Sequence, residues 1–480
     1  MISLWLAVPL AGALAACSSN DNGKAASGTG GSSGTGGSAS GTDGGGGTTG
    51  SGGAEQGSGG SPATDGGGGN TDAGAATDAN TAGTAPAVYT MSNDAAGNAI
   101  LGFRRATDGT LTPMAAAFAT GGKGSGAGLG EQGALAFDLA NNRLLAVNAG
   151  DNSVSVLPVS ADGSLATAVN VPAASAGAAG TSLLGPKSIT FHGDLIYVLY
   201  EGTGTMPSMI AGWKLTASGA TLTAAFISGS ALPLSSSTQG VDPAQIEFTP
   251  DGKWLLVTEK QSGANGAVMG AGKIDTFAVD SNGVATKMGS YDPAGAVAAT
   301  DAGTTGDAGA APAVTPFGFE FLGDHVIVSE AGLTGVASYT YAGGVIAPVA
   351  GKQFLATDPA PCWVAVSSNW AYVANARGPD VSGVTVASDG SLSNIGAVAN
   401  AVVASTGKTV PTDGGVTILG PTDEFFSADG KFLYVLNAGV PAIGIFQVQA
   451  NGELGRVGSG DYTPSSAAAL PVGSAGIVAR

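Results

Sequence analysis

Polar side chains recur along the chain beside short runs of β-branched and aromatic residues. Those that end such a run are Asn148, Glu201, Glu259, Glu330, Asn375 and Asn437, and those that precede or open another run are Lys187, Gln245, Trp363 and Asp423. A carboxylate among them can act as a general base if burial or a like charge tunes its pKa, and the amide and ammonium groups can orient a polar ligand. Asparagines and carboxylates in such places also cap the following loop by accepting bonds from backbone N–H groups, so both interpretations stay open.

Other chemistries leave little trace in the sequence. It contains no Asp-x-Asp-x-Asp-Gly loop typical of calcium sites and no His/Cys cluster typical of zinc or copper sites, so we expect neither a metal nor a cofactor. Acidic residues outnumber basic residues by 35 to 17, which gives a net charge of −18. Because such a surface repels a phosphate backbone, we expect no nucleic-acid partner. The contexts of Cys17 and Cys362 differ so much that we do not expect them to pair, and Cys362 is interpreted as a small buried residue.

A repeated phrase indicates which elements hold these side chains. Each copy has a short strand introduced by Pro or Gly, a tight turn, a second strand of β-branched and aromatic residues, a third strand and often an Asp-Gly-x-Leu turn. The clearest copies cover 420–454 and 242–283, and others centre on 144–147, 195–198, 326–328 and 371–373. Short alternating runs with Asp-Gly turns are typical of hairpins, and four antiparallel strands per repeated unit predict the blades of a β-propeller.

The first and last units are each incomplete. Residues 88–91 resemble a second strand with no first strand before it, and residues 471–479 resemble an opening strand with no blade after it. Pairing the two would close the ring and remove two exposed sheet edges. The sequence therefore predicts an all-β, seven-bladed β-propeller over residues 86–480, closed by its C-terminal strand. Both sets of polar residues then open on one face, at the mouth of the central channel.

The repeat resembles the lactonase-type seven-bladed propellers, which include bacterial 6-phosphogluconolactonases and fungal carboxymuconate-lactonizing enzymes. The phrases Thr-Pro-Asp-Gly-Lys at 249–253 and Ser-Ala-Asp-Gly-Lys-Phe-Leu-Tyr-Val at 427–435 carry the resemblance, which covers 86–480. It implies a site at the channel mouth, with Glu259 and Glu330 at places where the family carries a glutamate and therefore as candidate catalytic residues. Arg377 and Lys187 would orient an anionic substrate.

The chain departs from that family at the residue that its enzymes are thought to use most. A Pro-x-His is typical of the first strand, and here the matching positions hold Ser188, Gln245, Gly318 and Asp423. Both histidines, His192 and His325, fall in turns at the opposite end of the channel. Two functions stay open: a non-catalytic binding head, and a lactone hydrolase or lactonizing isomerase acting on a sugar-acid-like lactone. Lactone opening needs only a base and a stabilised oxyanion, so the second does not require the histidine.

The N-terminus predicts export and a lipid anchor. Residues 2–16 form an apolar run of 15 residues, too short to span a membrane, that ends in Leu14-Ala15-Ala16-Cys17. This resembles the lipobox of bacterial lipoproteins, which implies a signal peptide at 1–16 and a lipid on Cys17. Ser18 favours the outer membrane over inner-membrane retention, so the expected location is the cell envelope. No basic residue precedes the apolar run, and an ordinary cleaved signal stays open as the alternative.

Residues 17–85 predict a disordered tether. Nearly all of them are Gly, Ser, Thr, Ala, Asp or Asn, and none is aromatic. Such a segment cannot bury enough apolar surface to offset the entropy of ordering it. We therefore expect a monomeric head that stands clear of the membrane, with a small molecule, a glycan or an envelope protein as its partner.

Overall fold

The computed structural model describes most of the chain from Ala85 onward. The described residues are 85–172, 175–176, 181–202, 206–218, 221–235, 242–260, 272–293, 314–349, 354–357, 360–376, 380–395, 410–411, 417–418, 420–437, 442–462, 470–471 and 473–480. The predicted signal peptide, Cys17 and the predicted tether up to residue 84 lie outside them, and so does Arg377.

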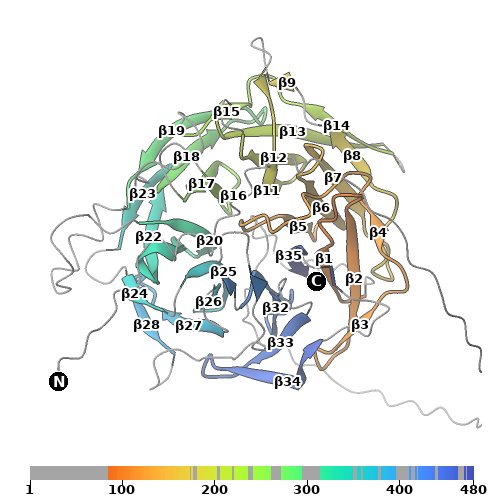
Figure 1. Cartoon of the computed structure of the whole chain (residues 1–480). Coiled ribbons are helices and arrows are strands. Elements are labelled where there is room, and N and C mark those ends of the chain that lie inside the picture. Colours follow the sequence, from red (N-terminus) through yellow and green to blue (C-terminus); the bar gives the residue numbers. More distant parts are fainter. Residues whose placement is uncertain are drawn as a thin grey trace, which may run out of the picture. The chain divides into compact units, whose positions relative to one another are not determined.

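The described residues form seven antiparallel blades in a ring, which confirms the predicted seven-bladed β-propeller (Figure 1). Blade 1 consists of β1 (Ala87–Met91), β2 (Ala99–Arg105), β3 (Leu111–Pro113), β4 (Phe118–Ala119) and β35 (Ala475–Ala479). Blade 2 consists of β5 (Leu135–Asp138), β6 (Arg143–Asn148), β7 (Ser153–Pro158) and β8 (Val169–Pro172). Blade 3 consists of β11 (Pro186–His192), β12 (Leu195–Tyr200), β13 (Met209–Ser218), β14 (Thr221–Phe226) and β15 (Leu232–Pro233).

The remaining blades repeat the same order from the channel outward. Blade 4 consists of β16 (Pro243–Phe248), β17 (Trp254–Glu259), β18 (Lys273–Val279) and β19 (Ala285–Tyr291). Blade 5 consists of β20 (Pro316–Leu322), β21 (His325–Glu330), β22 (Gly335–Ala342), β23 (Val345–Pro348) and β24 (Phe354–Ala356). Blade 6 consists of β25 (Pro361–Ser367), β26 (Trp370–Asn375), β27 (Asp380–Val386) and β28 (Leu392–Asn394), and blade 7 of β31 (Asp423–Phe426), β32 (Phe432–Asn437), β33 (Ala442–Val448) and β34 (Leu454–Tyr462). Two small hairpins, β9 (Ser175–Ala176) with β10 (Thr181–Ser182) and β29 (Val410–Pro411) with β30 (Thr417–Ile418), lie outside the blades.

The burial of the strands explains their composition. The second strands, such as β6, β17 and β26, are packed on both faces by neighbouring blades and are therefore almost continuously apolar. The outer strand β14 alternates between exposed and half-buried residues. Among the described residues the one helical element is the turn η2 (Ala331–Leu333), and no helix there is long and apolar enough to cross a lipid bilayer.

The C-terminal strand closes the ring. β35 pairs antiparallel with β1, with Val88 opposite Ala479 and Tyr89 opposite Val478, and becomes the innermost strand of blade 1. β1 pairs on its other side with β2. The predicted closure is confirmed, although the strand begins at Ala475 rather than at 471.

Four buried tyrosines join blades through the Asp-Gly and Asn-Gly turns. Each hydroxyl donates to the carbonyl oxygen of a turn glycine in the following blade, at 2.6–2.9 Å, in the pairs Tyr89–Gly163, Tyr197–Gly283, Tyr372–Gly452 and Tyr434–Gly109. These glycines have φ between 81° and 87°, a left-handed conformation that other residues rarely adopt. The pair Tyr434–Gly109 joins blade 7 to blade 1 and so reinforces the closure made by β35.

Side chains of one blade also form hydrogen bonds with backbone groups on the unpaired edge of the inner strand of the next blade. A strand edge that faces the channel carries backbone groups without a strand partner. The hydroxyl oxygens of Ser188 and Thr190 in β11 accept hydrogen bonds from the N–H groups of Ile246 and Phe248 in β16, both at 3.2 Å. Polar residues on the inner strands therefore have a structural use that requires no ligand.

Replacing Tyr434 by Phe should loosen the closure between blades 7 and 1. The change leaves the Gly109 carbonyl without its buried donor, so we expect the free energy of unfolding to fall by about 1–2 kcal/mol, measured by chemical denaturation of the full-length protein. Tyr341→Phe is the matched control, because the Tyr341 hydroxyl donates to Gly323 at an exposed site and its loss should cost less than about 0.5 kcal/mol. Equal losses in the two variants would contradict a special role for Tyr434.

Candidate functional site

The segment before β5 lies across the mouth of the central channel, and we name residues 130–133 the plug. The Ile189 N–H of blade 3 donates to the Gly133 oxygen at 2.8 Å, and the Gln132 N–H donates to the Ala244 oxygen of blade 4 at 3.2 Å. The Gln132 side chain binds Val364 of blade 6 in both directions, since Oε1 accepts from its N–H at 2.9 Å and Nε2 donates to its oxygen at 2.8 Å. One short segment thus joins three blades at the mouth.

Buried ion pairs surround the plug. Lys187 Nζ lies 2.8 Å from Asp242 Oδ1 and 3.3 Å from Glu201 Oε2, and Lys260 Nζ lies 2.9 Å from Asp242 Oδ2. Lys260 also donates to the Gly130 oxygen of the plug at 2.6 Å. The structure therefore brings together Lys187 and Glu201, both expected from the sequence, and adds Asp242 and Lys260, which were not.

Burial controls the protonation of this network. It raises the pKa of Glu131 in the plug to about 8, although Lys187 and Lys260 oppose the shift. It lowers the pKa of Lys260 to about 8, against the attraction of Asp242. Burial also opposes the charge of Lys187, but the carboxylates of Asp242 and Glu201 outweigh it and raise the pKa of Lys187. Glu131 and Lys260 can therefore gain or lose a proton near neutral pH, as a general acid and base must.

Trp363 anchors the plug from blade 6. Its indole Nε1 donates to the Glu131 oxygen at 2.7 Å, and its ring packs edge-on against Phe317 with the centroids 5.3 Å apart. Lys260 Nζ lies 5.0 Å from the centroid of the same Phe317 ring, within the range of a cation–π contact. Trp363 was expected to bind a ligand, and its place in the structure is beneath the plug.

The two carboxylates expected to be catalytic are buried at the ends of β17 and β21. Glu259 is fully buried, and its Oε1 accepts a bond from the Ser235 N–H at 3.1 Å. Glu330 is also fully buried: Oε1 accepts from the Tyr339 hydroxyl at 2.9 Å, and Oε2 has no hydrogen-bond partner in the described part of the chain. Burial raises the pKa of Glu330 to about 8, against the effect of the Tyr339 bond. The partners come from different segments, since Ser235 precedes blade 4 and Tyr339 belongs to β22 of blade 5.

The three strand-end asparagines are buried and differ in their partners. Asn148 Nδ2 donates to Ser155 Oγ in β7 at 2.8 Å, and Asn375 Nδ2 donates to Asp380 Oδ1 in β27 at 2.7 Å. These bonds tie the second strand to the third strand of the same blade. The Asn437 amide has no hydrogen-bond partner among the described residues.

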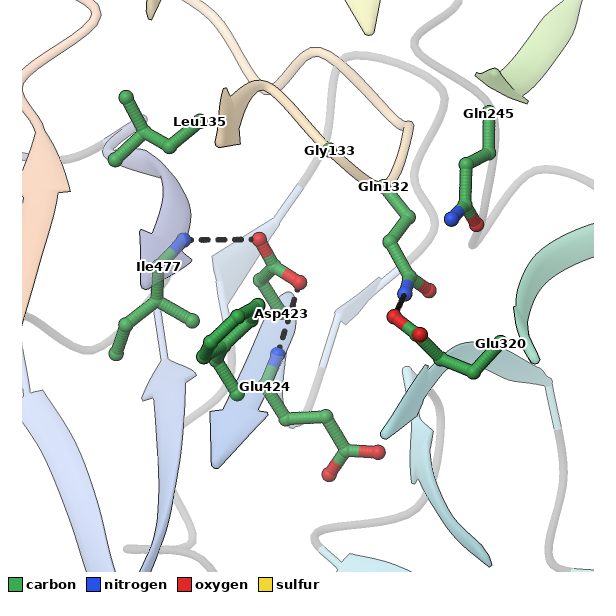
Figure 2. A pocket seen from close by; sticks show the side chains of 9 residues that line it. Gln132, Gly133, Leu135, Gln245, Glu320, Asp423, Glu424 and Ile477 are labelled. Carbon is green, nitrogen blue, oxygen red and sulfur yellow. Dashed lines mark hydrogen bonds between the residues drawn. The ribbon is translucent and has the colours of Figure 1, made fainter. Parts of the chain in front are cut away.

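Two further residues expected to bind a ligand hold the ring together instead. Gln245 Nε2 donates to the Phe319 oxygen at 2.9 Å, and its Oε1 accepts from the Phe319 N–H at 2.7 Å. Asp423 accepts from the N–H groups of Glu424 at 2.9 Å and of Ile477 in β35 at 3.0 Å (Figure 2). Both side chains form hydrogen bonds with backbone groups of inner strands, as the Ser188 side chain does. Arg377, which was also expected to bind a ligand, lies outside the described residues.

A small cavity lies in the channel beside the plug (Figure 2). It is lined by Gln132, Gly133, Leu135, Gln245, Glu320, Asp423, Glu424, Phe425 and Ile477. It leaves about 20 Å³ for the centre of a water-sized group, which is room for about one water molecule. Three lining side chains are carboxylates and none is basic. In the described part of the chain, no group of three or more His, Cys, Asp or Glu side chains is arranged to hold a metal ion.

Sequence reasoning missed several of these groups by a single position. Lys260 follows the predicted Glu259, and Glu424 follows the predicted Asp423. Successive side chains of a strand point to opposite faces, so an offset of one residue selects a different environment. Glu131 had no signal of its own, because it lies in a connection whose course depends on the assembled ring.

Cys362 is fully buried in β25, as expected of a small buried residue. Cys17 lies outside the described residues, so its state stays a prediction.

Comparison with known proteins identifies the fold. The sequence matches no protein-family model and no curated protein. Among solved structures, a candidate 6-phosphogluconolactonase from Bacteroides fragilis is similar with a TM-score of 0.56 and 17% identity, covering 84% of this chain and 100% of that one. A second candidate 6-phosphogluconolactonase, from Bacteroides uniformis, has a TM-score of 0.54 and 16% identity over 82% of this chain and 99% of its own. A protein from Lactobacillus plantarum has a TM-score of 0.53 and 16% identity over 82% and 99%. The chain therefore has the lactonase-like propeller fold that its repeats predicted.

The raised pKa of Glu131 predicts a pH-dependent stability. Its usual pKa is 4.5 and its folded value is about 8, so between these pH values the folded state keeps a proton that the unfolded state releases. Stability due to this group is complete below about pH 4.5 and is lost as the pH rises toward about 8, with a slope of up to about 1.4 kcal/mol per pH unit. Thermal unfolding across this range should show a shallower loss for Glu131→Gln than for the wild type.

The exposed Glu453 provides the control for this measurement. Glu453→Gln removes a carboxylate from an exposed turn and should leave the wild-type pH profile unchanged. A Glu131→Gln profile that runs parallel to the wild type would refute the assignment.

Proposed function

We propose that this protein is a lipid-anchored component of the cell envelope whose propeller binds a partner and catalyses no reaction. The plug is the observation that carries the proposal. At the channel mouth, where the resemblance to lactonases puts a substrate, Gln132 bonds to Val364 and Trp363 bonds to Glu131. Residues that could recognise a substrate are thus bonded to one another.

The burial and hydrogen bonding of the candidate catalytic groups support the same proposal. Glu259 and Glu330 are fully buried and bonded to Ser235 and Tyr339, and Gln245 is used on the backbone of Phe319. No histidine stands at the mouth to replace them, because His192 and His325 lie at the turns between first and second strands. A binding surface, in contrast, needs no freely accessible base.

The charge of the protein favours a particular kind of partner. The Glu201 side chain at the mouth is 41% exposed, and the whole chain has a net charge of −18. Acidic surfaces attract cationic groups and offer acceptors to hydroxyl groups. A hydroxyl-rich glycan or a basic envelope protein therefore suits this face better than an anionic metabolite.

A second candidate, lactone hydrolysis outside the cytoplasm, has one observation in its favour. Glu131 and Lys260 both have a pKa of about 8 at the channel mouth, a value suited to acid–base work at neutral pH. Two of the similar structures are described as candidate 6-phosphogluconolactonases. Phosphorylated sugar lactones are cytosolic, so an exported protein would act on an unphosphorylated one.

A lactone screen separates the two candidates. The full-length protein should hydrolyse sugar-acid and aliphatic lactones no faster than buffer does, because Glu131 and Lys260 are both buried. Acid release in the presence of a pH indicator measures this. The binding proposal fails if the wild type turns over a lactone and Glu131→Gln or Glu330→Gln slows it by roughly 100-fold or more, the range expected for loss of a general acid or base. Glu453→Gln, at an exposed turn, is the matched control and should behave as the wild type in either case.

The anchor has its own test. Cells that express the full-length protein should incorporate labelled palmitate into it, and Cys17→Ala should abolish the label, since Cys17 ends the lipobox. Cys362→Ala, which leaves the lipobox intact, is the control and should keep the label. The sulfur of Cys17 can carry a lipid or a disulfide but not both. Mass spectrometry that found Cys17 joined to Cys362 and free of lipid would contradict the anchor.

A further inference from the structure

The plug departs from the repeat in its sequence. Blades 3 to 7 each have a proline three residues before the inner-strand residue that pairs two residues from the end of the second strand: Pro186, Pro243, Pro316, Pro361 and Pro421. Leu135 has that pairing in blade 2, so Gln132 takes the place of the proline. Proline lacks an N–H group, whereas glutamine has a backbone donor and a side-chain amide. Residue 132 can therefore form bonds that its five counterparts cannot.

The backbone of blade 2 departs from the repeat at the same point. In blades 3 to 6 the carbonyl oxygen before the proline accepts a bond, at 2.8–3.0 Å, from the first N–H after the second strand of the same blade; the pairs are Gly185–Glu201, Asp242–Lys260, Thr315–Ala331 and Ala360–Ala376. The matching residues of blade 2 are Glu131 and Ala149. The Glu131 oxygen instead accepts from the Trp363 indole of blade 6 at 2.7 Å. A segment that elsewhere bonds to its own blade thus crosses the channel.

The plug forms bonds that a strand residue forms elsewhere in the ring. Gln132 binds the Val364 peptide group in both directions, and Gln245 binds that of Phe319 in the same way. Gly318 leaves space for the first of these amides, since a Cβ atom there would clash with Gln132 Oε1. Gln245 lies within the paired strand β16, whereas Gln132 lies in the connection before β5. The two amides therefore make the same bonds from different kinds of support.

Glycines lie at both ends of the plug. Gly130 has a φ of 61° and Gly133 has a φ of 82°, in the left-handed region that other residues rarely adopt. Between them, Glu131 and Gln132 are 4% and 5% exposed. Hinges are a few residues in connections that absorb changes in φ and ψ, and glycine does so at the lowest steric cost. The plug is thus a short buried segment between two residues suited to act as hinges.

A balance of buried charges holds the plug in its place. The charged groups that act on the Glu131 carboxyl, or that pair with those groups, are Lys187 of β11, Lys260 after β17, Asp242 before β16 and Glu201 after β12. Two cations and two anions cancel, so the cluster is neutral while Glu131 keeps its proton. An ionised Glu131 adds an uncompensated buried charge, which water would solvate far better. Ionisation therefore favours a plug that has left the mouth.

We propose that the plug is a latch with two positions. In the closed position, which this structure shows, it lies across the channel mouth. In the open position it lies against blade 2, with the Glu131 oxygen bonded to the Ala149 N–H as in blades 3 to 6. Opening uncovers Trp363 and Phe317, which are 4% and 0% exposed in the closed position, and brings the Glu131 side chain into water. The latch controls access to the mouth and does not depend on what the head binds there.

The protonation of Glu131 sets the balance between the two positions. Burial raises its pKa to about 8 in the closed position, and exposure returns it to the usual 4.5. The closed position is therefore fully favoured below about pH 4.5 and loses ground as the pH rises toward about 8, by up to about tenfold in the equilibrium constant per pH unit. Lys260, whose pKa burial lowers to about 8, stays charged over most of this range and does not reverse the trend.

Hydrogen exchange of the full-length protein, measured by mass spectrometry at the level of single amides, tests the latch. The Val364 amide reports on the plug because it donates to Gln132, and the Phe319 amide is the matched control because it donates to Gln245. After correction for intrinsic rates, we expect Val364 to be about tenfold or more less protected than Phe319, since local opening costs less than unfolding. Its protection should fall by up to about tenfold per unit between about pH 5.5 and about pH 7.5.

Two variants separate the parts of the proposal. Gln132→Pro restores the residue of five other blades and removes the bonds to Ala244 and Val364, so Val364 should lose further protection while Phe319 keeps it. Glu131→Gln keeps the shape of the plug and should remove the pH dependence of Val364. If Gln132→Pro does not fold, Phe319 also loses its protection, and Gln132→Ala then takes its place because it leaves the backbone N–H intact.

Three outcomes would overturn the latch. Equal protection of Val364 and Phe319 in the wild type would mean that the plug is a fixed part of the ring. Full protection of Val364 in a folded Gln132→Pro or Gln132→Ala protein would mean that the plug does not cover this amide. A pH dependence that survives Glu131→Gln would exclude Glu131 as the group that opens the mouth.

Discussion

Hydrogen bonds that pass from one blade to the next are the interactions on which this ring depends. Strand pairing ends at the edges of each blade, so the blades are joined by side chains and by the backbone of connections such as the plug. Tyrosine hydroxyls reach the turn glycines of the following blade, and Ser188, Thr190, Gln245 and Asp423 cover the free edges of inner strands. The requirement that every buried backbone group find a partner explains why polar residues lie on strands that otherwise form an apolar core.

This constraint also explains which parts of the molecule could be predicted from its sequence. The blades follow from local signals, namely alternating strands and turn glycines, and the closure follows from an orphan strand at each end. The roles of Gln245 and Asp423 could not be predicted, because a side chain that binds a ligand and one that binds a neighbouring strand have the same residue type and spacing. Only the assembled ring shows that the Phe319 backbone lies beside Gln245. Glu424 could have been found from the sequence by aligning the repeats strand by strand. The inner-strand residues in the same register of the other blades are all apolar: Leu135, Ile189, Ile246, Phe319, Val364 and Ile477.

The ring separates two polar regions whose residues are interleaved along the sequence. At the mouth, Lys187, Asp242 and Lys260 balance one another around the plug, and the acid of Glu131 stays neutral because it is buried. The cavity beside the plug, in contrast, is lined by three carboxylates and by no basic side chain. The similarity to lactonase-like propellers describes the scaffold that both regions share and does not distinguish between them.

The position of β1 has a mechanical consequence. The chain enters the head at Ala85 and leads directly into β1, which is not an edge strand but is paired to β2 on one side and to β35 on the other. A force transmitted along the chain from its N-terminal side is therefore shared by two ladders of hydrogen bonds, and β35 is the last strand of the protein. A pulling force on the propeller therefore acts on the pairing of β1 with β35, which is also the pairing that closes the ring. In a protein held at a surface under flow, the hydrogen bonds between β1 and β35 would therefore both resist the pulling force and keep the ring of blades closed.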